Sequence, residues 1–257
     1  MTQAKSYECA TCAVGNLSID GSLPEGWRIS QGAAICGDCD LFAAQARDQG
    51  QQARNPAADY VRCETAIPLR SGSYLDLANP DCSVITPIDI AAGLRQPRFG
   101  AQTRDFYTIA QHSLLVLRLV SPIARQLGGD KGLQLRRCAL MHDAAEAFIH
   151  DIVTPLKRQL PDYRKIEARL ELRLADRFGW SWTDYRRQQV KLADLQALAI
   201  EQRDLVGRTD PWPILDRINR AALGSVKITR CWHPAEAEER FLAAFADLFP
   251  SDERLAA

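Results

Sequence analysis

The sequence of 257 residues has no excess of charge of either sign, because Lys and Arg together number 32 and so do Asp and Glu. A neutral chain has no general electrostatic attraction to nucleic acid or to anionic lipid. No apolar run approaches the ~18 residues of a membrane span, and the first ten residues, MTQAKSYECA, contain no apolar signal core. We therefore expect a cytoplasmic protein without membrane contact.

Cysteine is more plentiful, with eight residues in the chain. Disulfide scaffolds are mostly short and secreted, which does not fit this sequence. Four of the cysteines form two Cys-x-x-Cys pairs separated by 23 residues, namely Cys9, Cys12, Cys36 and Cys39. Two such pairs supply the four thiolates of a tetrahedral zinc site, although a redox pair or an iron–sulfur site uses the same ligands. We predict a structural zinc module, with a short helix after it, over residues 1–53.

The charge of this predicted module argues against a role in nucleic-acid binding. Residues 1–60 contain four basic and seven acidic side chains, so their net charge is −3. An acidic surface binds phosphate poorly, and a stabilising or protein-contact role is favoured instead. Residues 54–72 are predicted to be a linker, and residues 73–250 to form the second domain.

The second domain is predicted to be an all-α helical bundle with a small β-hairpin at its start. Ser73–Leu77 and Cys82–Ile85 flank Asn79-Pro80-Asp81, which is typical of a hairpin turn. Thr86, Pro87 and Asp89 form a helix-start signal. Apolar residues at helical spacing predict helices over 106–120, 132–148, 162–178, 183–206 and 234–248.

Five ionisable side chains lie on apolar helical faces in this domain: His112, His142, Asp143, Glu146 and Asp194. A lone histidine on such a face is more often a hydrogen-bonded core residue, and Asp194 alone could pair with an arginine. Burial of a lone carboxylate is costly unless it is paired or bound to metal. Three separate helices each place such a group at their centre, and the spacing puts Glu146 on the same helical face as His142 and Asp143. This conjunction predicts a metal site.

At these residues the chain resembles the HD-domain phosphohydrolases, and is most similar to the bacterial 5′-deoxynucleotidases and related phage and prophage hydrolases. The resemblance rests on the run from His142 to Lys157, HDAAEAFIHDIVTPLK, and on the FYTIAQHS run that contains His112. It covers residues 73–248 and excludes the cysteine module. Two positions depart from the family pattern, since His150 stands where relatives often have glycine and Phe99 where deoxynucleotidases have tryptophan.

The resemblance implies a ligand set and a set of catalytic roles. One divalent ion would be held by His112, His142, Asp143 and Asp194; such mixed nitrogen and oxygen ligation suits Mn²⁺, Co²⁺, Zn²⁺ or Fe²⁺. Glu146 would orient or deprotonate a water molecule, and Asp151 would assist the leaving group or contact the sugar. Arg98 and Lys157 would neutralise phosphate charge, with Phe99 beside the arginine.

The function implied is hydrolysis of a 2′-deoxynucleoside 5′-monophosphate to nucleoside and phosphate. One alternative is a dNTP triphosphohydrolase of the phage type. Another is a nucleic-acid-binding or scaffold protein with a degenerate site, against which the intact ligand set and the acidic module argue. The expected partner is a small-molecule nucleotide, and a homodimer or higher homo-oligomer is a reasonable assembly for a helical enzyme.

Overall fold

The computed structural model describes residues 64–100, 102–208 and 210–250, together with the backbone of four short strands near the N-terminus. The chain divides into two compact units. One comprises Met1–Ile85 with Thr154–Arg173, and the other comprises Thr86–Val153 with Leu174–Ala257. The second unit contains the residues predicted to bind metal.

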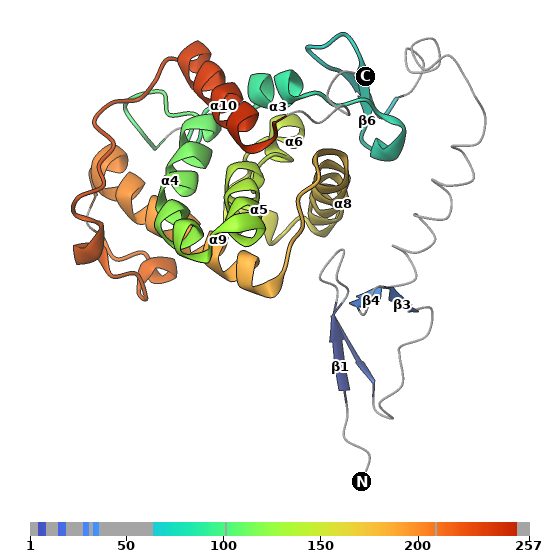
Figure 1. The fold of residues 1–257 in the computed structure, drawn as a ribbon, viewed down its shortest axis with the longest axis horizontal. Helices are drawn as coiled ribbons and strands as arrows, with labels where there is room; N and C mark the ends of the chain where they lie inside the picture. The colour runs from blue at the N-terminus through green and yellow to red at the C-terminus, as the bar shows by residue number, and fades with distance from the viewer. Residues whose placement is uncertain are drawn as a thin grey trace. The chain divides into compact units, whose positions relative to one another are not determined.

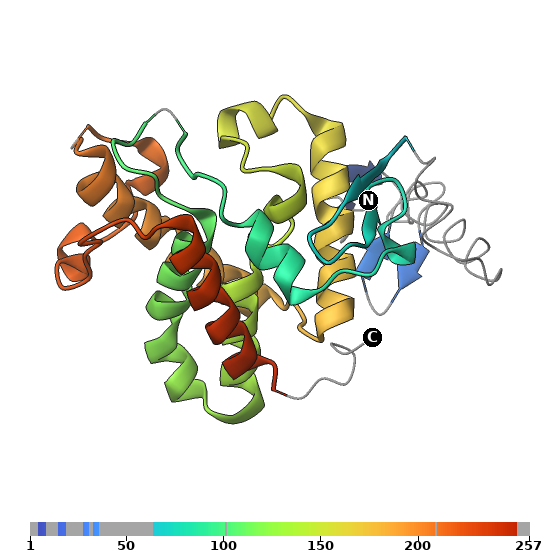
Figure 2. The ribbon, with the colours of Figure 1, turned by 90° about the horizontal axis from the view of Figure 1, so that it is seen from above.

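Helices form the second unit, which is drawn in green, orange and red in Figures 1 and 2. Its longest helix, α4 (Ile109–Leu127), packs against α5 (Gly129–Met141), α9 (Asp184–Glu201) and α10 (Pro234–Leu248). The shorter α3 (Pro87–Gly93) packs against α10 and α6 (Glu146–Ile149). Ile109, Val116, Leu135, Leu140 and Phe241 are fully buried among these helices.

Local sequence signals set several helix ends. Thr86 and Asp89 form a reciprocal capping box at the start of α3, as the sequence predicts. Thr108 caps α4 by accepting a hydrogen bond from the Gln111 amide, so this helix begins three residues later than predicted. The helix α10 has the predicted bounds, and α8 (Pro161–Phe178) ends before Gly179, whose φ is 71°.

The chain beyond α9 contains only short helical turns. The π-helical η2 (Gln202–Val206) continues α9, where a longer α-helix was predicted. Two 3₁₀ turns follow, η3 (Pro213–Leu215) and η4 (Arg220–Leu223). Together with α9 they form one end of the second unit.

The small hairpin exists, but its predicted position was wrong. Strand β5 (Ala66–Pro68) pairs antiparallel with β6 (Tyr74–Asp76), and the Leu69 amide closes the turn on the Ser73 carbonyl at 2.9 Å. Pro80–Cys82 forms the 3₁₀ turn η1 instead of a hairpin turn, because Pro80 fixes the backbone at the start of a helical turn. The strand β5 therefore lies within the segment 54–72 that the sequence assigned to a linker.

The helix predicted over residues 132–148 is interrupted at His142 and Asp143, so the prediction of one continuous helix was wrong. Helix α5 ends at Met141, and His142–Ala145 form turns before α6 begins. The amides of Glu146 and Ala147 bond three residues back, to Asp143 and Ala144, so the coil tightens here. After the break, α6 packs closely on α3, since a Cβ on Gly93 of α3 would lie 2.2 Å from the Ala147 carbonyl oxygen.

The first unit contains β5, β6, η1, α7 (Thr154–Lys157) and most of α8. Arginines of α8 hold the segment after the hairpin, because Arg169 donates to the Ala78 carbonyl at 3.1 Å and Arg173 to the Pro80 carbonyl at 3.3 Å. Near the N-terminus, β1 (Lys5–Glu8) pairs with β2 (Gly15–Ser18), and β3 (Arg28–Ser30) with β4 (Ala33–Ile35). The four cysteines of the predicted zinc module and the short helix expected after them lie outside the described residues.

These elements confirm the predicted fold class, an all-α helical domain with a small β-hairpin. Within the described part of the chain, none of the helices has both the length and the apolar character needed to cross a membrane.

Candidate metal centre

His112 lies near the start of α4 and is completely buried. Its Nδ1 atom lies 2.6 Å from the Glu201 carboxylate, which can only accept a hydrogen bond when ionised. The Nδ1 atom therefore carries a proton, so in the neutral imidazole, the form that binds metal, the lone pair of His112 is on Nε2.

His142 ends α5, and its Nδ1 atom lies 2.9 Å from the Ala139 carbonyl oxygen. A carbonyl accepts hydrogen bonds only, so the lone pair of His142 is also on Nε2. The Nε2 atoms of His112 and His142 face each other at 3.3 Å. Two lone pairs at this distance repel unless a proton or a cation lies between them.

Two carboxylates lie beside these nitrogens, Asp143 near both and Asp194 near that of His112. Asp143 Oδ2 lies 3.2 Å from His142 Nε2 and 3.5 Å from His112 Nε2, and Asp194 Oδ1 of α9 lies 3.4 Å from His112 Nε2. The ligand atoms of His112, His142 and Asp143 all lie within 4.8 Å of one another. The fold thus brings together the four residues that the resemblance named as ligands.

The spacing of these donor atoms fits a divalent ion. Ligand atoms about 2.1 Å from a metal are about 3.0–3.4 Å apart in octahedral and tetrahedral geometry. The separations of 3.2–3.5 Å at the centre match this spacing. The hydrogen-bonded Nδ1 atoms also fix both imidazoles with Nε2 toward the site, as metal-binding histidines require.

Arg98 reaches the same centre from the loop that precedes α4. Its backbone amide donates to the Tyr107 carbonyl at 2.7 Å, and its guanidinium lies 3.4 Å from Asp143, 3.7 Å from Asp194 and 3.5 Å from Glu201. Burial alone would lower the pKa of Arg98, but these three carboxylates raise it above its usual range. Arg98 is therefore a permanent positive charge at the wall of the site.

The electrostatics of the centre favour positive charge between its donor atoms. Burial and Arg98 lower the pKa of His112, but Glu201 and Asp194 raise it, with a net value of about 9. For Asp143 burial raises the pKa, but His142, His112 and Arg98 lower it well below its usual range. The carboxylates thus stay ionised, and a cation at the centre is stabilised by them.

Glu201 is a functional residue that the sequence reasoning missed. Its side chain is fully buried, and it binds the Nδ1 atom of His112 and the hydroxyl of Tyr107, the latter at 3.0 Å. Although burial raises the pKa of Glu201, His112 and Arg98 lower it, so the carboxylate is ionised. Its position seven residues after Asp194, two turns along the same helical face, was the available signal.

Glu146 and His150 lie together on α6 and its C-terminus. Glu146 is buried, at 4% exposure, and its backbone carbonyl accepts a hydrogen bond from the side-chain Nε2 of Gln96. The Gln96 side chain also contacts the His150 ring, through Oε1 and Nδ1. His150 has a φ of 67°, a left-handed conformation that glycine adopts without strain.

The remaining predicted residues differ in their relation to the centre. Phe99 has a φ of 61°, and its ring centre lies 5.3 Å from the Arg98 guanidinium carbon. Asp151 is half-buried and is among the carboxylates that raise the pKa of Arg98. Lys157 belongs to the other unit, where it forms an ion pair with Glu167 at 2.6 Å.

The chain is similar in sequence to a known domain family and to two known bacterial proteins. The model of the HD domain matches residues 109–199, a range that includes all four predicted ligands. The uncharacterized protein YfdR of Escherichia coli (strain K12) is 36% identical over 178 residues, which are 68% of this chain and 89% of YfdR. An uncharacterized protein of Rhodobacter capsulatus is 35% identical over 143 residues, covering 53% of this chain and 71% of its own length.

This chain belongs to the HD-domain family. The HD domain is characteristic of metal-dependent phosphohydrolases, and the centre described above has the donor set that such chemistry needs. In this HD-domain protein, the matched range 109–199 contains all four predicted ligands. Arg98 precedes this range and Glu201 follows it.

Proposed function

We propose that the protein hydrolyses 2′-deoxynucleoside 5′-monophosphates to nucleoside and phosphate at the centre formed by His112, His142, Asp143 and Asp194. The observation that carries the proposal is the convergence of two Nε2 lone pairs and two carboxylates beside the buried guanidinium of Arg98. A divalent ion supplies the Lewis acidity, when bound, that lowers the pKa of a water molecule and polarises the phosphoryl group.

Arg98 is the phosphate-binding residue in this proposal. The guanidinium is always charged and presents several N–H donors in one plane, which matches the oxygens of a phosphate. The contacts of its guanidinium with the carboxylates of the centre are long, at 3.4–3.7 Å. Arg98 can therefore turn its donors to phosphate oxygens without losing a short hydrogen bond. Phe99, adjacent to it, would contact the sugar or base.

Two acidic residues of the segment after α5 are assigned to proton transfer. Glu146 is buried at the first position of α6, where a carboxylate can take a proton from an attacking water. Asp151 follows two residues after α6 and adds negative potential at Arg98. In the proposal Asp151 passes to the departing 5′ oxygen of the nucleoside the proton that Glu146 takes from water, so its carboxylate first accepts this proton and then donates it.

The test is product release from a panel of nucleotides by the full-length protein. Deoxynucleoside and ribonucleoside mono- and triphosphates are incubated with Mn²⁺, Co²⁺ or Mg²⁺, and phosphate, pyrophosphate and triphosphate are quantified. The proposal predicts orthophosphate from deoxynucleoside monophosphates. Release of triphosphate from a dNTP would instead favour the triphosphohydrolase alternative, and DNA affinity without hydrolysis would favour a degenerate site.

Variants locate the activity. His142→Ala and Asp194→Ala should each lose bound metal and phosphate release. Asp184→Ala is a matched control, because Asp184 is exposed at the start of the same helix as Asp194. Turnover that persists at the wild-type rate in metal-depleted His142→Ala would overturn the assignment.

A further inference from the structure

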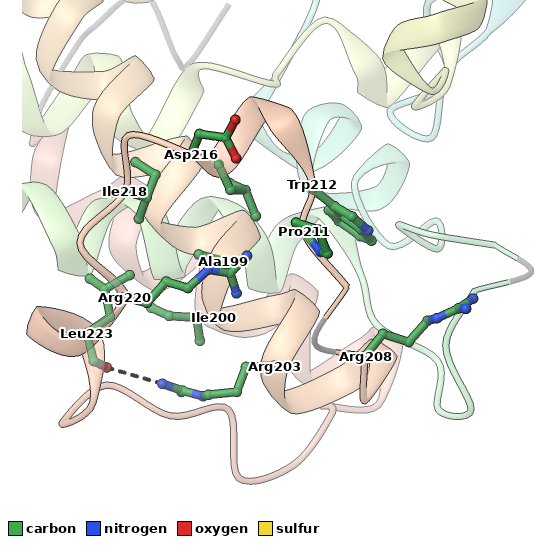
Figure 3. A pocket seen from close by; sticks show the side chains of 11 residues that line it. Ala199, Ile200, Arg203, Arg208, Pro211, Trp212, Asp216, Ile218, Arg220 and Leu223 are labelled. Carbon is green, nitrogen blue, oxygen red and sulfur yellow. Dashed lines mark hydrogen bonds between the residues drawn. The ribbon is translucent and has the colours of Figure 1, made fainter.

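A separate pocket of ≈ 510 Å³ lies at the other end of the second unit, between the C-terminal turns of α9 and the short helices η2, η3 and η4 (Figure 3). Its volume is within the range of small-molecule sites. The lining combines apolar side chains, including Ile200 and Leu215, with the indole of Trp212 and three arginines. One acidic residue, Asp216, also lines it.

This pocket is distinct from the metal centre, although both use α9. An α-helix turns by about 100° per residue, so Asp194 and Glu201, seven residues apart, share one face. Ala199 and Ile200 are five and six residues after Asp194, which places them at about 140° and 240° from it, on the opposite face. The centre and the pocket therefore lie on opposite sides of one helix.

The three lining arginines are not equivalent. Arg203 is held by a two-pronged contact with Asp204 at 2.6 and 2.8 Å and by the Val226 carbonyl at 2.6 Å, so its role is structural. Arg208 is exposed and contacts Asp210 at 2.7 Å. Arg220 donates to the neutral Gln202 side chain at 2.6 Å and makes no ion pair within the described part of the chain.

The lining favours an anion that also carries a flat ring. Guanidinium groups bind phosphate oxygens through two parallel hydrogen bonds, and an indole stacks on planar aromatic groups. Arg220 can exchange its neutral amide contact for phosphate, whereas Arg208 points away from Arg220 in Figure 3 and would have to leave its surface ion pair with Asp210 and turn inward to join it. Trp212 is half-buried at the same pocket, so a base could lie against its indole ring.

The pocket is also linked to the metal centre through consecutive residues. The side chain of Gln202 is buried. Its Nε2 donates to the Asp210 backbone carbonyl at 2.9 Å, and its Oε1 accepts a hydrogen bond from Arg220. The preceding residue, Glu201, binds Nδ1 of His112. A ligand that draws Arg220 away from Gln202 would release the residue next to the one that orients His112. The π-helical geometry of η2 at this point is frequent at functional sites.

We propose that this pocket is an effector site for a nucleotide, with phosphate on Arg208 and Arg220 and the base on Trp212, and that its occupancy acts on the metal centre through Gln202 and Glu201. The binding site is independent of the proposed function, whereas the regulatory role rests on it.

Calorimetry with dATP as the probe tests the site. The full-length His142→Ala protein without added divalent metal serves as the parent, so that metal-dependent binding at the catalytic centre does not contribute. We expect the parent to bind dATP, and Arg220→Met or Trp212→Leu added to it to weaken binding about tenfold or more. Arg217→Met is the matched control, because Arg217 is an exposed neighbour that does not line the pocket.

Two further titrations separate the parts of the ligand. Adenosine and inorganic triphosphate should each bind more weakly than dATP. Absence of dATP binding, or equal binding by the parent and by both pocket variants, overturns the site.

Histidine NMR tests the link to the metal centre without requiring activity. The chain has four histidines, so the ring signals of His112 can be assigned by substitution. In the metal-free wild-type protein, dATP should shift the His112 signals, and it should not do so in Arg220→Met. Unchanged His112 signals at a dATP concentration that saturates the pocket would overturn the link while leaving the binding result standing.

Discussion

Glu201→Gln is the substitution that most directly tests how the protein positions His112. Oε1 of Glu201 accepts hydrogen bonds from His112 at 2.6 Å and from Tyr107 at 3.0 Å, while Oε2 faces Nε of Arg98 at 3.5 Å. A glutamine keeps the shape and one oxygen. Its amide group, however, would present a donor to the Arg98 donor, and the negative charge that stabilises the buried positive groups would be lost.

The expected magnitude follows from this loss. Residues that orient a metal-binding histidine typically contribute about 10- to 100-fold to metal affinity. Because Glu201 is fully buried and its bond to His112 is charge-assisted, we expect Glu201→Gln to weaken Mn²⁺ binding by about this factor, or about 1.4–2.8 kcal/mol. Tyr107→Phe removes one neutral donor and should weaken binding by less than about tenfold.

The Mn²⁺ affinity of the full-length variant is measured by isothermal titration calorimetry at neutral pH. Circular dichroism checks that the variant keeps its helical content. Glu239→Gln is the control, since Glu239 is exposed on α10. A folded Glu201→Gln protein that binds Mn²⁺ as tightly as wild type would refute the role assigned to Glu201.

Three other perturbations have defined outcomes. Arg98→Met should abolish most phosphate release while metal still binds, measured by turnover beside Mn²⁺ titration; unchanged turnover would exclude Arg98 as the phosphate contact. Gly93→Ala forces a Cβ against the Ala147 carbonyl and should cost about 1–3 kcal/mol in urea unfolding. Burial raises the pKa of Asp204, but hydrogen bonds from Arg203 and the Ile228 amide lower it below its usual range. Ionised Asp204 therefore stabilises the folded protein above pH ~4, and this contribution is lost as the pH falls further. The stability difference between wild type and Asp204→Asn should therefore shrink on acidification, and a difference that grew would contradict the sign.

The sequence predicted best where the structure is decided locally. The cap at Thr86, the stop at Gly179 and the start of α10 at Pro234 all depend on residues within one turn of the helix end. The convergence of His112 and His142 was also predictable, since costly buried groups on several apolar faces imply a shared site.

Features decided by tertiary contacts were not predictable in the same way. The break after Met141 is followed by the close approach of α3 and α6 at Gly93, and no local signal encodes that approach. The hairpin was misplaced because Asn79-Pro80-Asp81 satisfies the rules for a turn, although Pro80 begins the 3₁₀ turn η1. The position of Glu201 beside His112 and Arg98 joins segments about a hundred residues apart in sequence.

The most direct test of the central claim is the divalent-metal content of the full-length protein, measured together with phosphate release. We expect His142→Ala and Asp194→Ala each to lose one divalent ion per chain together with phosphate release. Asp184→Ala should keep both. A wild-type metal content and wild-type phosphate release in His142→Ala or Asp194→Ala would contradict a catalytic metal at this centre.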